Sequence, residues 1–329
     1  MIFKKAIINL LALGGIPRII QRFQSYNSVT VLAYHCVVDK PLDVWDWCFL
    51  DKEQFRKQIR YLVRSFKVVS LSEAVQRIQN NQIEEPTAVI TFDDGFHNIY
   101  SQAFPILQEF NVPATIFLAT GTIGSDRTIW FTRLLRAIIE TQSSQLKWNG
   151  EQYYLHTANY KKESSLQLQA TLKLLPAPLL EKSLCEIEER LGFEPDSPIP
   201  DGSVFRMLTN DTIQLMRDSG LIEFGAHTVN HTILSKLDSS LKKEEIQAST
   251  ADVELMAGDT CRFFAYPNGR LEDFDSESMR LLKEMGIEAA VTMVPGQNKG
   301  DSPMMELNRY GIGADISMSR FKLIIHHIL

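Results

Sequence analysis

The chain has few cysteines and no feature of a nucleic-acid-binding protein. Its 329 residues include four cysteines, which are scattered along the chain without a C-x-x-C pair: Cys36, Cys48, Cys185 and Cys261. This spacing does not support a disulfide framework or a zinc knuckle, and it indicates buried thiols of the kind found in a reducing compartment. The net charge of -6 and the lack of a basic run give no reason to expect a nucleic-acid partner.

Apolar runs long enough to span a bilayer are also absent. Residues 1–27 combine Lys4 and Lys5 with a short apolar run and later arginines, but lack the small-x-small site of a secretory signal. Two interpretations remain open, a helix packed on the domain and a helix lying on an anionic membrane surface. We expect a cytoplasmic protein, which the second interpretation places at the inner face of the membrane, and secretion is the less favoured alternative.

Strand-like and helix-like segments alternate through residues 28–329, and no repeat of fixed period is visible. One helix shows its spacing clearly, with Phe55, Ile59 and Leu62 on one face, and Ser72 is the expected N-cap of the next helix. The expected strands are 29–37, 87–92, 114–120, 221–228, 261–269 and 288–294. The expected helices are 51–66, 72–79, 98–110, 209–220, 241–258, 276–286 and 319–327.

The segment from about 121 to 205 interrupts this alternation. It contains one clear helical stretch, then polar sequence and a proline-rich approach to the next unit, and we interpret it as a mostly helical insertion within one domain. Repeated strand-helix units predict an α/β protein with a parallel sheet. A (β/α) barrel is our first expectation, and an open doubly wound sheet is the second.

Polar side chains cluster where the expected strands end, which is the functional edge of either architecture. These residues are His35, Asp93, Asp94, His227, His231, Tyr266 and Asn268. Two histidines at i and i+4 lie on one face of a helical turn, so both imidazoles could bind one ion. A carboxylate adds a hard oxygen ligand, and such a set suits Zn²⁺ or another divalent transition ion. The second aspartate would then be close enough to accept a proton from water that the ion acidifies.

The text TFDDG, HTVNH and the later YPNG resembles the polysaccharide deacetylases of the NodB-homology type, carbohydrate esterase family 4. The resemblance covers about residues 86–120 and 204–295. It implies a distorted (β/α)7-8 barrel and a divalent metal, most often zinc, that serves to remove acetyl groups from sugars. By this resemblance, Asp93 is the general base and Asp94, His227 and His231 hold the metal. The backbone N–H of Asn268 would stabilise the oxyanion.

Two features of the family pattern are missing. The arginine that pairs with the base aspartate is replaced by Ala265, and we expect Arg309 to supply that charge. The late Leu-x-His motif is absent, and we interpret His326 and His327 as surface residues. Because the text AYHCV resembles a strand end of exopolysaccharide-associated members, His35 is the expected general acid.

Aromatic residues near these strand ends are candidates for sugar binding. Trp130, early in the insertion, could stack on a pyranose ring, although core packing is the common alternative. Tyr266 could line the cleft, or it could be a buried strand tyrosine. The expected function is metal-dependent removal of acetyl groups from N-acetylhexosamines of a polysaccharide or a lipid-linked glycan. The alternatives are a non-catalytic carbohydrate-binding or scaffold protein, and a related hydrolase acting on non-sugar amides.

Overall fold

The computed structural model describes residues 27–328. The N-terminal segment 1–27, for which a packed helix and a membrane-surface helix were both open, thus lies outside the described residues except for Asn27. Within the described range, no helix combines the length and the apolar character needed to cross a membrane.

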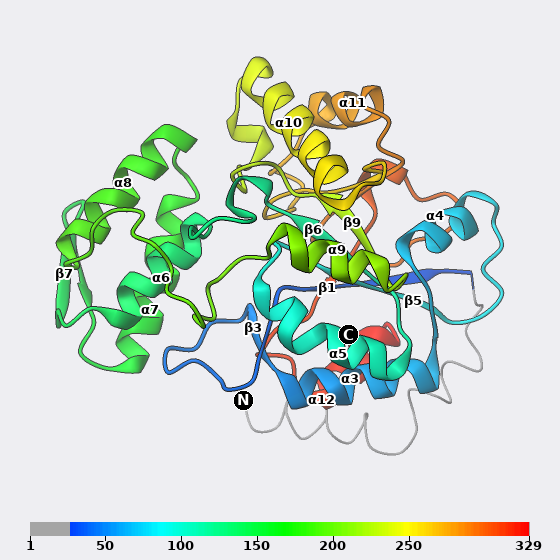
Figure 1. Ribbon diagram of the computed structural model, residues 1–329, viewed down its shortest axis with the longest axis horizontal. Coiled ribbons are helices and arrows are strands. Elements are labelled where there is room, and N and C mark those ends of the chain that lie inside the picture. Colours follow the sequence, from blue (N-terminus) through cyan, green and yellow to red (C-terminus); the bar gives the residue numbers. More distant parts are fainter. Residues whose placement is uncertain (1–26, 329) are drawn as a thin grey trace.

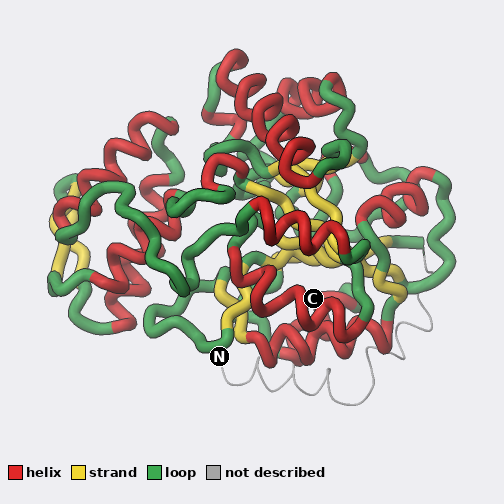
Figure 2. Tube along the Cα trace, in the orientation of Figure 1, coloured by secondary structure: helices red, strands yellow, loops and turns green. Residues whose placement is uncertain are grey.

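A parallel sheet forms the centre of the molecule, and helices surround it (Figures 1 and 2). Seven strands are hydrogen-bonded neighbours in the order β11-β10-β9-β6-β5-β1-β12, and β4 pairs with β5 beside this path. Their bounds are β1 Val29–Tyr34, β4 Lys67–Val68, β5 Thr87–Phe92, β6 Ala114–Leu118, β9 Ile222–Ala226, β10 Phe263–Ala265, β11 Ala289–Val291 and β12 Tyr310–Gly311. All these pairings are parallel, as the alternation of strands and helices predicts.

The segment from Leu307 to Gly311 joins the two ends of this sheet. Leu307 makes a parallel bridge to Val291 of β11, and four residues later Gly311 pairs with Ala33 of β1. The ring of strands therefore closes on itself through a short and irregular segment. This confirms the predicted distorted (β/α) barrel and excludes the open doubly wound sheet.

Alternate residues of each strand belong to two different apolar clusters, because successive side chains point to opposite faces. In β5, Val89 lies in the barrel interior, whereas Ile90 and Phe92 pack outward against the helices. Phe117 of β6 also lies inside. Four side chains of α4 join the interior cluster, so this helix covers the end of the barrel at which β5 begins: Leu71, Ala74, Val75 and Ile78.

The helices between the strands follow the sequence pattern closely. They are α3 Lys52–Ser65, α4 Leu71–Gln79, α5 Phe104–Phe110, α9 Asn210–Asp218, α10 Ser239–Ala257, α11 Ser276–Glu284 and α12 Met318–Ile325. Shorter elements are β2 Cys36–Val38, β3 Phe49–Asp51, the π-helical turn η1 Ile99–Ala103 and the 3₁₀ turns η2 Thr120–Thr122, η3 Leu234–Lys236 and η4 Met304–Glu306.

Two predictions about helix ends are wrong. The N-cap of α4 is Ser70, whose hydroxyl accepts from the Glu73 N–H, and the helix begins at Leu71, one residue before Ser72. His326 and His327 are not surface residues either. His326 is buried with its Nε2 3.0 Å from the Tyr61 hydroxyl, and the half-buried His327 contacts Thr30 in β1.

The segment between β6 and α9, which contains the expected insertion of about 121–205, holds three helices that lie to one side of the barrel (Figure 1). Its helices are α6 Trp130–Glu140, α7 Ala158–Leu172 and α8 Ala177–Arg190. It also contains an antiparallel hairpin that the sequence interpretation missed, β7 Gln145–Trp148 and β8 Glu151–Tyr154. The signal was present, since Asn149 and Gly150 both have positive φ and Asn-Gly is the preferred two-residue hairpin turn.

Candidate metal centre and catalytic groups

The two adjacent aspartates leave β5 in different directions. Asp93 has the same strand parity as Val89 and Thr91, so its side chain points into the barrel. Asp94 has φ +76, and Gly95 follows with φ +85. This left-handed turn ends the strand and directs the second carboxylate toward the loop after β9 and not toward the outer helices.

The two histidines of GAHTVNH lie on a loop, not on a helical turn as their spacing suggested. His227 directly follows β9, and the chain then bends through Thr228 at φ +60 and His231 at φ +53. The Thr228 hydroxyl accepts a hydrogen bond from the Thr232 N–H, which closes the loop. The loop thus brings the two imidazoles together, with ring centroids 4.8 Å apart, without helical geometry.

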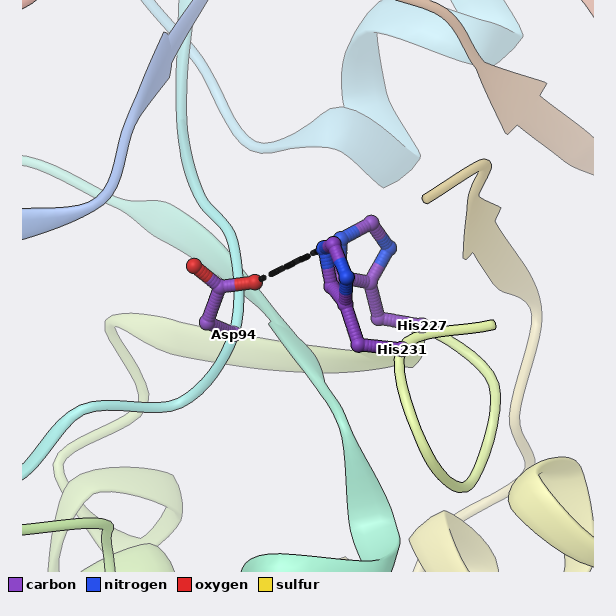
Figure 3. Close-up of side chains that lie close together, drawn as sticks. All are labelled: Asp94, His227 and His231. Atoms are coloured by element: carbon purple, nitrogen blue, oxygen red, sulfur yellow. Dashed lines mark ion pairs between the residues drawn. The ribbon is translucent and has the colours of Figure 1, made fainter. Parts of the chain in front are cut away.

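Asp94, His227 and His231 converge on one point (Figure 3). The Asp94 Oδ1 lies 3.6 Å from His227 Nε2 and 3.3 Å from His231 Nε2. Two atoms that each bind one Zn²⁺ at ~2.1 Å lie at most ~4.2 Å apart, so both separations fit a shared ion. The donor set, two imidazole nitrogens and one carboxylate oxygen, is also one that divalent transition ions prefer.

The surroundings of the three groups also fit a metal ion. Asp94 is 0% exposed and neither of its oxygens has a hydrogen-bond partner among the described residues. A buried carboxylate without a partner is costly, and a bound cation removes that cost. His227 Nδ1 lies 2.7 Å from the Ala265 carbonyl oxygen, so this nitrogen carries the proton and Nε2 keeps its lone pair toward Asp94.

The pKa shifts of Asp94, His227 and His231 also fit a bound metal ion. Burial and the neighbouring Asp93 charge raise the pKa of the Asp94 carboxyl well above its ordinary value. Burial lowers the pKa of His227, and burial together with His227 lowers that of His231. The histidines are therefore neutral, which is the form that binds metal, while the Asp94 charge is unfavourable until a cation balances it.

Asp93 is paired with Arg309, as expected from the sequence. The guanidinium donates from Nη1 and Nη2 to the two carboxylate oxygens, each over 2.7 Å, and both side chains are buried. Arg309 also donates to the Thr292 carbonyl and to the Thr91 hydroxyl. Burial alone raises the pKa of Asp93, but Arg309 outweighs this and holds it well below the ordinary range. Asp93 is therefore ionised at neutral pH.

Arg309 reaches Asp93 because of the barrel closure. The residue lies between Leu307, which bridges to β11, and Tyr310, which pairs with β1. Its side chain enters the interior and its guanidinium lies 5.6 Å from the Phe117 ring centre. The arginine missing at Ala265 is therefore replaced from a different strand.

His35 lies at the end of β1, next to the strand that carries the aspartates. The imidazole packs edge-on against Trp47, with ring centroids 4.8 Å apart, and its Nδ1 has no partner among the described residues. Burial lowers its pKa to about 4, although the Asp93 charge acts in the opposite direction. At neutral pH His35 is therefore uncharged.

Asn268 occupies a tight turn after β10. Its φ is +61 and that of Gly269 is +69, and the Gly269 N–H donates to the Pro267 carbonyl. In the described part of the chain, no backbone or side-chain acceptor takes a hydrogen bond from the Asn268 N–H. This donor is therefore available to a ligand.

The two aromatic candidates have different positions. Trp130 begins α6 and lines a cleft of about 480 Å³ that also reaches His231, so it remains a candidate for sugar binding. Tyr266 is only 1% exposed, donates its hydroxyl proton to the Met305 carbonyl and stacks on Phe274 at 4.1 Å. The expected cleft contact of Tyr266 is wrong, and its alternative, a buried strand tyrosine, is what the structure contains.

Two residues near the site were missed from sequence. Trp47 is half-buried and covers one side of His35. Lys173, in the loop after α7, lines the cleft and donates to the Asn268 side-chain oxygen over 3.1 Å. Neither lies at a strand end or in a motif, so no sequence signal indicated them.

A model of the family described as polysaccharide deacetylase matches residues 80–175 and 197–290, which together exceed half of the chain. The chain belongs to the polysaccharide deacetylase family. The two matched segments contain both aspartates, both histidines and Asn268, and the gap between them falls inside the insertion. The family resemblance inferred from TFDDG and HTVNH is thus confirmed.

Relatives within the polysaccharide deacetylase family match over part of their length. A poly-beta-1,6-N-acetyl-D-glucosamine N-deacetylase of Staphylococcus epidermidis is 33% identical over 112 residues, which are 30% of this chain and 38% of the relative. A protein of the same name from Staphylococcus aureus is 32% identical over 78 residues, 23% of this chain and 27% of the relative. The aligned regions therefore span well under half of these deacetylases.

Solved structures match over nearly the whole chain but at low identity. The Streptococcus pyogenes deacetylase PplD, in complex with acetate, has a TM-score of 0.60 at 17% identity and covers 91% of this chain and 98% of its own. IcaB from Ammonifex degensii has a TM-score of 0.60 at 20% identity, with coverage of 91% and 97%. These likenesses establish that the distorted barrel is the fold of known deacetylases.

Proposed function

We propose that this chain is a metal-dependent N-deacetylase that removes acetyl groups from N-acetylglucosamine units of a β-1,6-linked polysaccharide. The observation that carries the proposal is the meeting of two different carboxylates at the end of β5. Asp94 lies buried beside two neutral imidazoles and accepts no hydrogen bond from the described residues, while Asp93 is held ionised by Arg309. One is suited to a cation and the other to a proton.

Asp94, His227 and His231 would hold the ion, and their ligand set favours Zn²⁺ among the common divalent metals. When bound, the ion supplies Lewis-acid chemistry, which polarises an acetamide carbonyl and acidifies water. The choice of β-1,6-linked N-acetylglucosamine rests on the names of the staphylococcal relatives.

The remaining groups have roles that follow from their surroundings. Asp93 accepts the proton of the attacking water, since Arg309 keeps it ionised. The free Asn268 N–H donates to the oxygen that becomes negative in the tetrahedral intermediate. His35 delivers a proton to the departing amine. Because its pKa is about 4, it is neutral at the start, so it takes up a proton from solvent before it donates, and the proton that Asp93 accepts from water returns to solvent.

The test is acetate release from β-1,6-linked N-acetylglucosamine oligomers by the purified chain supplied with Zn²⁺, Co²⁺, Mn²⁺ or Mg²⁺ in turn. We expect release with Zn²⁺ and none from Asp93→Asn under the same conditions. Matched β-1,4-linked oligomers and a simple acetamide test the linkage and the sugar requirement. Glycan binding without acetate release for every metal would instead indicate a carbohydrate-binding protein, and release from the simple acetamide alone would indicate a non-sugar amidase.

A further inference from the structure

The insertion extends one side chain into the candidate site. Lys173 follows the last residue of α7 and lies 95 residues before Asn268 in the sequence, yet its ammonium nitrogen is 3.1 Å from the Asn268 Oδ1. A second contact holds the insertion against the barrel domain, since the Lys162 ammonium lies 4.0 Å from the Trp45 ring centre. Lys173 therefore occupies a fixed position on the wall of the cleft that reaches His231.

The Asn268 side chain is held from both ends. Its Oδ1 accepts from Lys173, and its Nδ2 donates to Asp273 Oδ2 over 2.5 Å. The same Asp273 oxygen accepts from the Arg270 N–H over 2.8 Å, which fixes the carboxylate in the turn. Asn268 itself has φ +61, a conformation that is strained for most residues and tolerated by asparagine when its side chain is hydrogen-bonded. This turn determines where the Asn268 N–H points.

Lys173 is half-buried. Burial lowers its pKa and Arg270 adds to the lowering, while the carboxylates of Asp273 and Asp46 act in the opposite direction. A hydrogen bond donated by a charged group in such surroundings is stronger than one between neutral groups. The contact to Asn268 thus restricts the amide more firmly than a solvent-exposed lysine could.

From these contacts we propose that Lys173 is a positioning residue for the deacetylation reaction, which holds Asn268 in the left-handed turn so that its backbone N–H faces the developing oxyanion. The inference rests on the proposed function. It assigns the insertion a part in catalysis, because the barrel alone does not supply the hydrogen bond to Asn268 Oδ1.

The main variant is Lys173→Met, which keeps the length and apolar stem but removes the donor. We expect kcat for acetate release to fall by roughly 10- to 100-fold, because a misplaced oxyanion donor weakens transition-state binding. KM and the zinc content should stay within about twofold of wild type, since Lys173 makes no hydrogen bond or ion pair with the three candidate ligands within the described residues. Lys182→Met on the exposed surface of α8 is the matched control and should leave all three quantities unchanged.

A double-mutant cycle with Asn268→Gly separates positioning from a direct effect of the charge. Glycine adopts positive φ without a side chain and keeps the backbone N–H. If Lys173 acts through the Asn268 amide, adding Lys173→Met to Asn268→Gly causes no further loss. A full additional loss in the glycine background would overturn the proposal, as would an unchanged kcat for Lys173→Met.

Failure of the proposed function gives a different result from failure of this inference. If wild-type protein releases no acetate with any metal, the proposed function fails. The contact is then tested by a crystal structure of Lys173→Met, in which we expect Asn268 to leave the left-handed conformation. An Asn268 turn identical to that of wild type overturns the positioning role whether or not the protein is active.

Discussion

Asp93 and Asp94 are neighbours in the chain, yet their carboxylates have opposite surroundings. Asp93 receives two hydrogen bonds from Arg309, whereas Asp94 receives none from the described residues. The backbone turns between them, because β5 ends at Phe92 and Asp94 has φ +76. The pKa of Asp93 is lowered and that of Asp94 is raised. Opposite shifts in two neighbouring acids are typical of sites in which the two acids have separate tasks.

The first prediction separates these tasks. Asp94→Asn should lower the zinc content well below one ion per chain, because an amide is a weaker ligand than a carboxylate. Asp93→Asn should keep its zinc but lower kcat by at least ~10²-fold, since it removes the proton acceptor. Metal content by mass spectrometry and acetate release on the same samples check both. Equal zinc loss in the two variants would contradict this division.

The second prediction concerns the Arg309 pair. Arg309→Met leaves a buried carboxylate without its partner, so we expect a loss of about 3–5 kcal/mol in the free energy of unfolding. The pKa of Asp93 is lower in the folded state than its unfolded value of 3.8, so ionised Asp93 stabilises the folded state at pH values above 3.8. This stabilisation is lost as the pH falls through the folded pKa. Without Arg309, burial raises the pKa of Asp93. The decrease of kcat/KM at low pH, the acid limb of its pH profile, should therefore move to higher pH.

Two further variants make this test decisive. Arg309→Lys keeps the charge but loses the two-pronged hydrogen bonding, and should give intermediate stability and an intermediate acid limb. The control is Arg320→Met, which removes a half-exposed ion pair between Arg320 and Asp315 at 3.5 Å. We expect this variant to lower the free energy of unfolding by under ~1 kcal/mol. An acid limb unchanged in Arg309→Met would show that Asp93 does not control it.

At the residue scale, the motifs TFDDG and HTVNH indicated a metal site, and the family resemblance that they carry assigned Asp94, His227 and His231 as ligands. Arg309 was expected because the resemblance requires an arginine beside the base aspartate and position 265 is alanine. Lys173 could not be found in this way. It lies in an insertion, and only the fold of the chain brings it within 3.1 Å of Asn268.

At the scale of elements, the loops that hold the site depend on left-handed backbone. Asp94, Thr228, His231 and Asn268 all have positive φ, and each is a candidate site residue or lies between two of them. Hydrophobic periodicity predicts strands and helices but carries no information about such turns. The i and i+4 spacing of the two histidines predicted a helical turn, which is wrong. The two imidazoles nevertheless lie close together, because the loop bends through residues with positive φ.

The third prediction tests the turn after β5. In Gly95→Ala, φ of +85 is strained and the new methyl group would lie 2.9 Å from side-chain atoms of Ile123 and Leu118. In Gly286→Ala, φ is +81 but no atom lies within 4 Å of the new methyl group. The control should cost about 1–2 kcal/mol. Gly95→Ala should cost an additional ~1–3 kcal/mol from overpacking, measured by urea unfolding. Equal costs would show that the pocket around Gly95 adapts.

At the scale of the whole molecule, the barrel closes through the segment 307–311 and the insertion covers one side of the cleft. The repeated strand-helix units were sufficient to predict a barrel. They could not predict how it closes, because β12 has only two residues and its neighbour Leu307 makes a single bridge. Yet this weak element carries Arg309, so the same segment completes both the sheet and the candidate site.

The final prediction is that the metal centre costs stability when no metal is bound. The folded pKa of Asp94 is raised, so the folded state holds its proton more tightly than the unfolded chain. The metal-free protein therefore loses stability as pH rises from 3.8 through the raised pKa. At pH 7, metal-free Asp94→Asn should be about 1–3 kcal/mol more stable than metal-free wild type, and this advantage should shrink toward pH 5.

Added zinc should reverse that order. A ligand present at about 1,000 times its Kd stabilises the folded state by about 4 kcal/mol, and we expect this gain for wild type alone. Urea unfolding at pH 7 and pH 5, with chelator or with excess zinc, measures all four states for both proteins. If metal-free Asp94→Asn is less stable than wild type and gains as much from zinc, Asp94 is a structural carboxylate. The opposite result would mean that the fold keeps an unfavourable charge at this position because a cation offsets it.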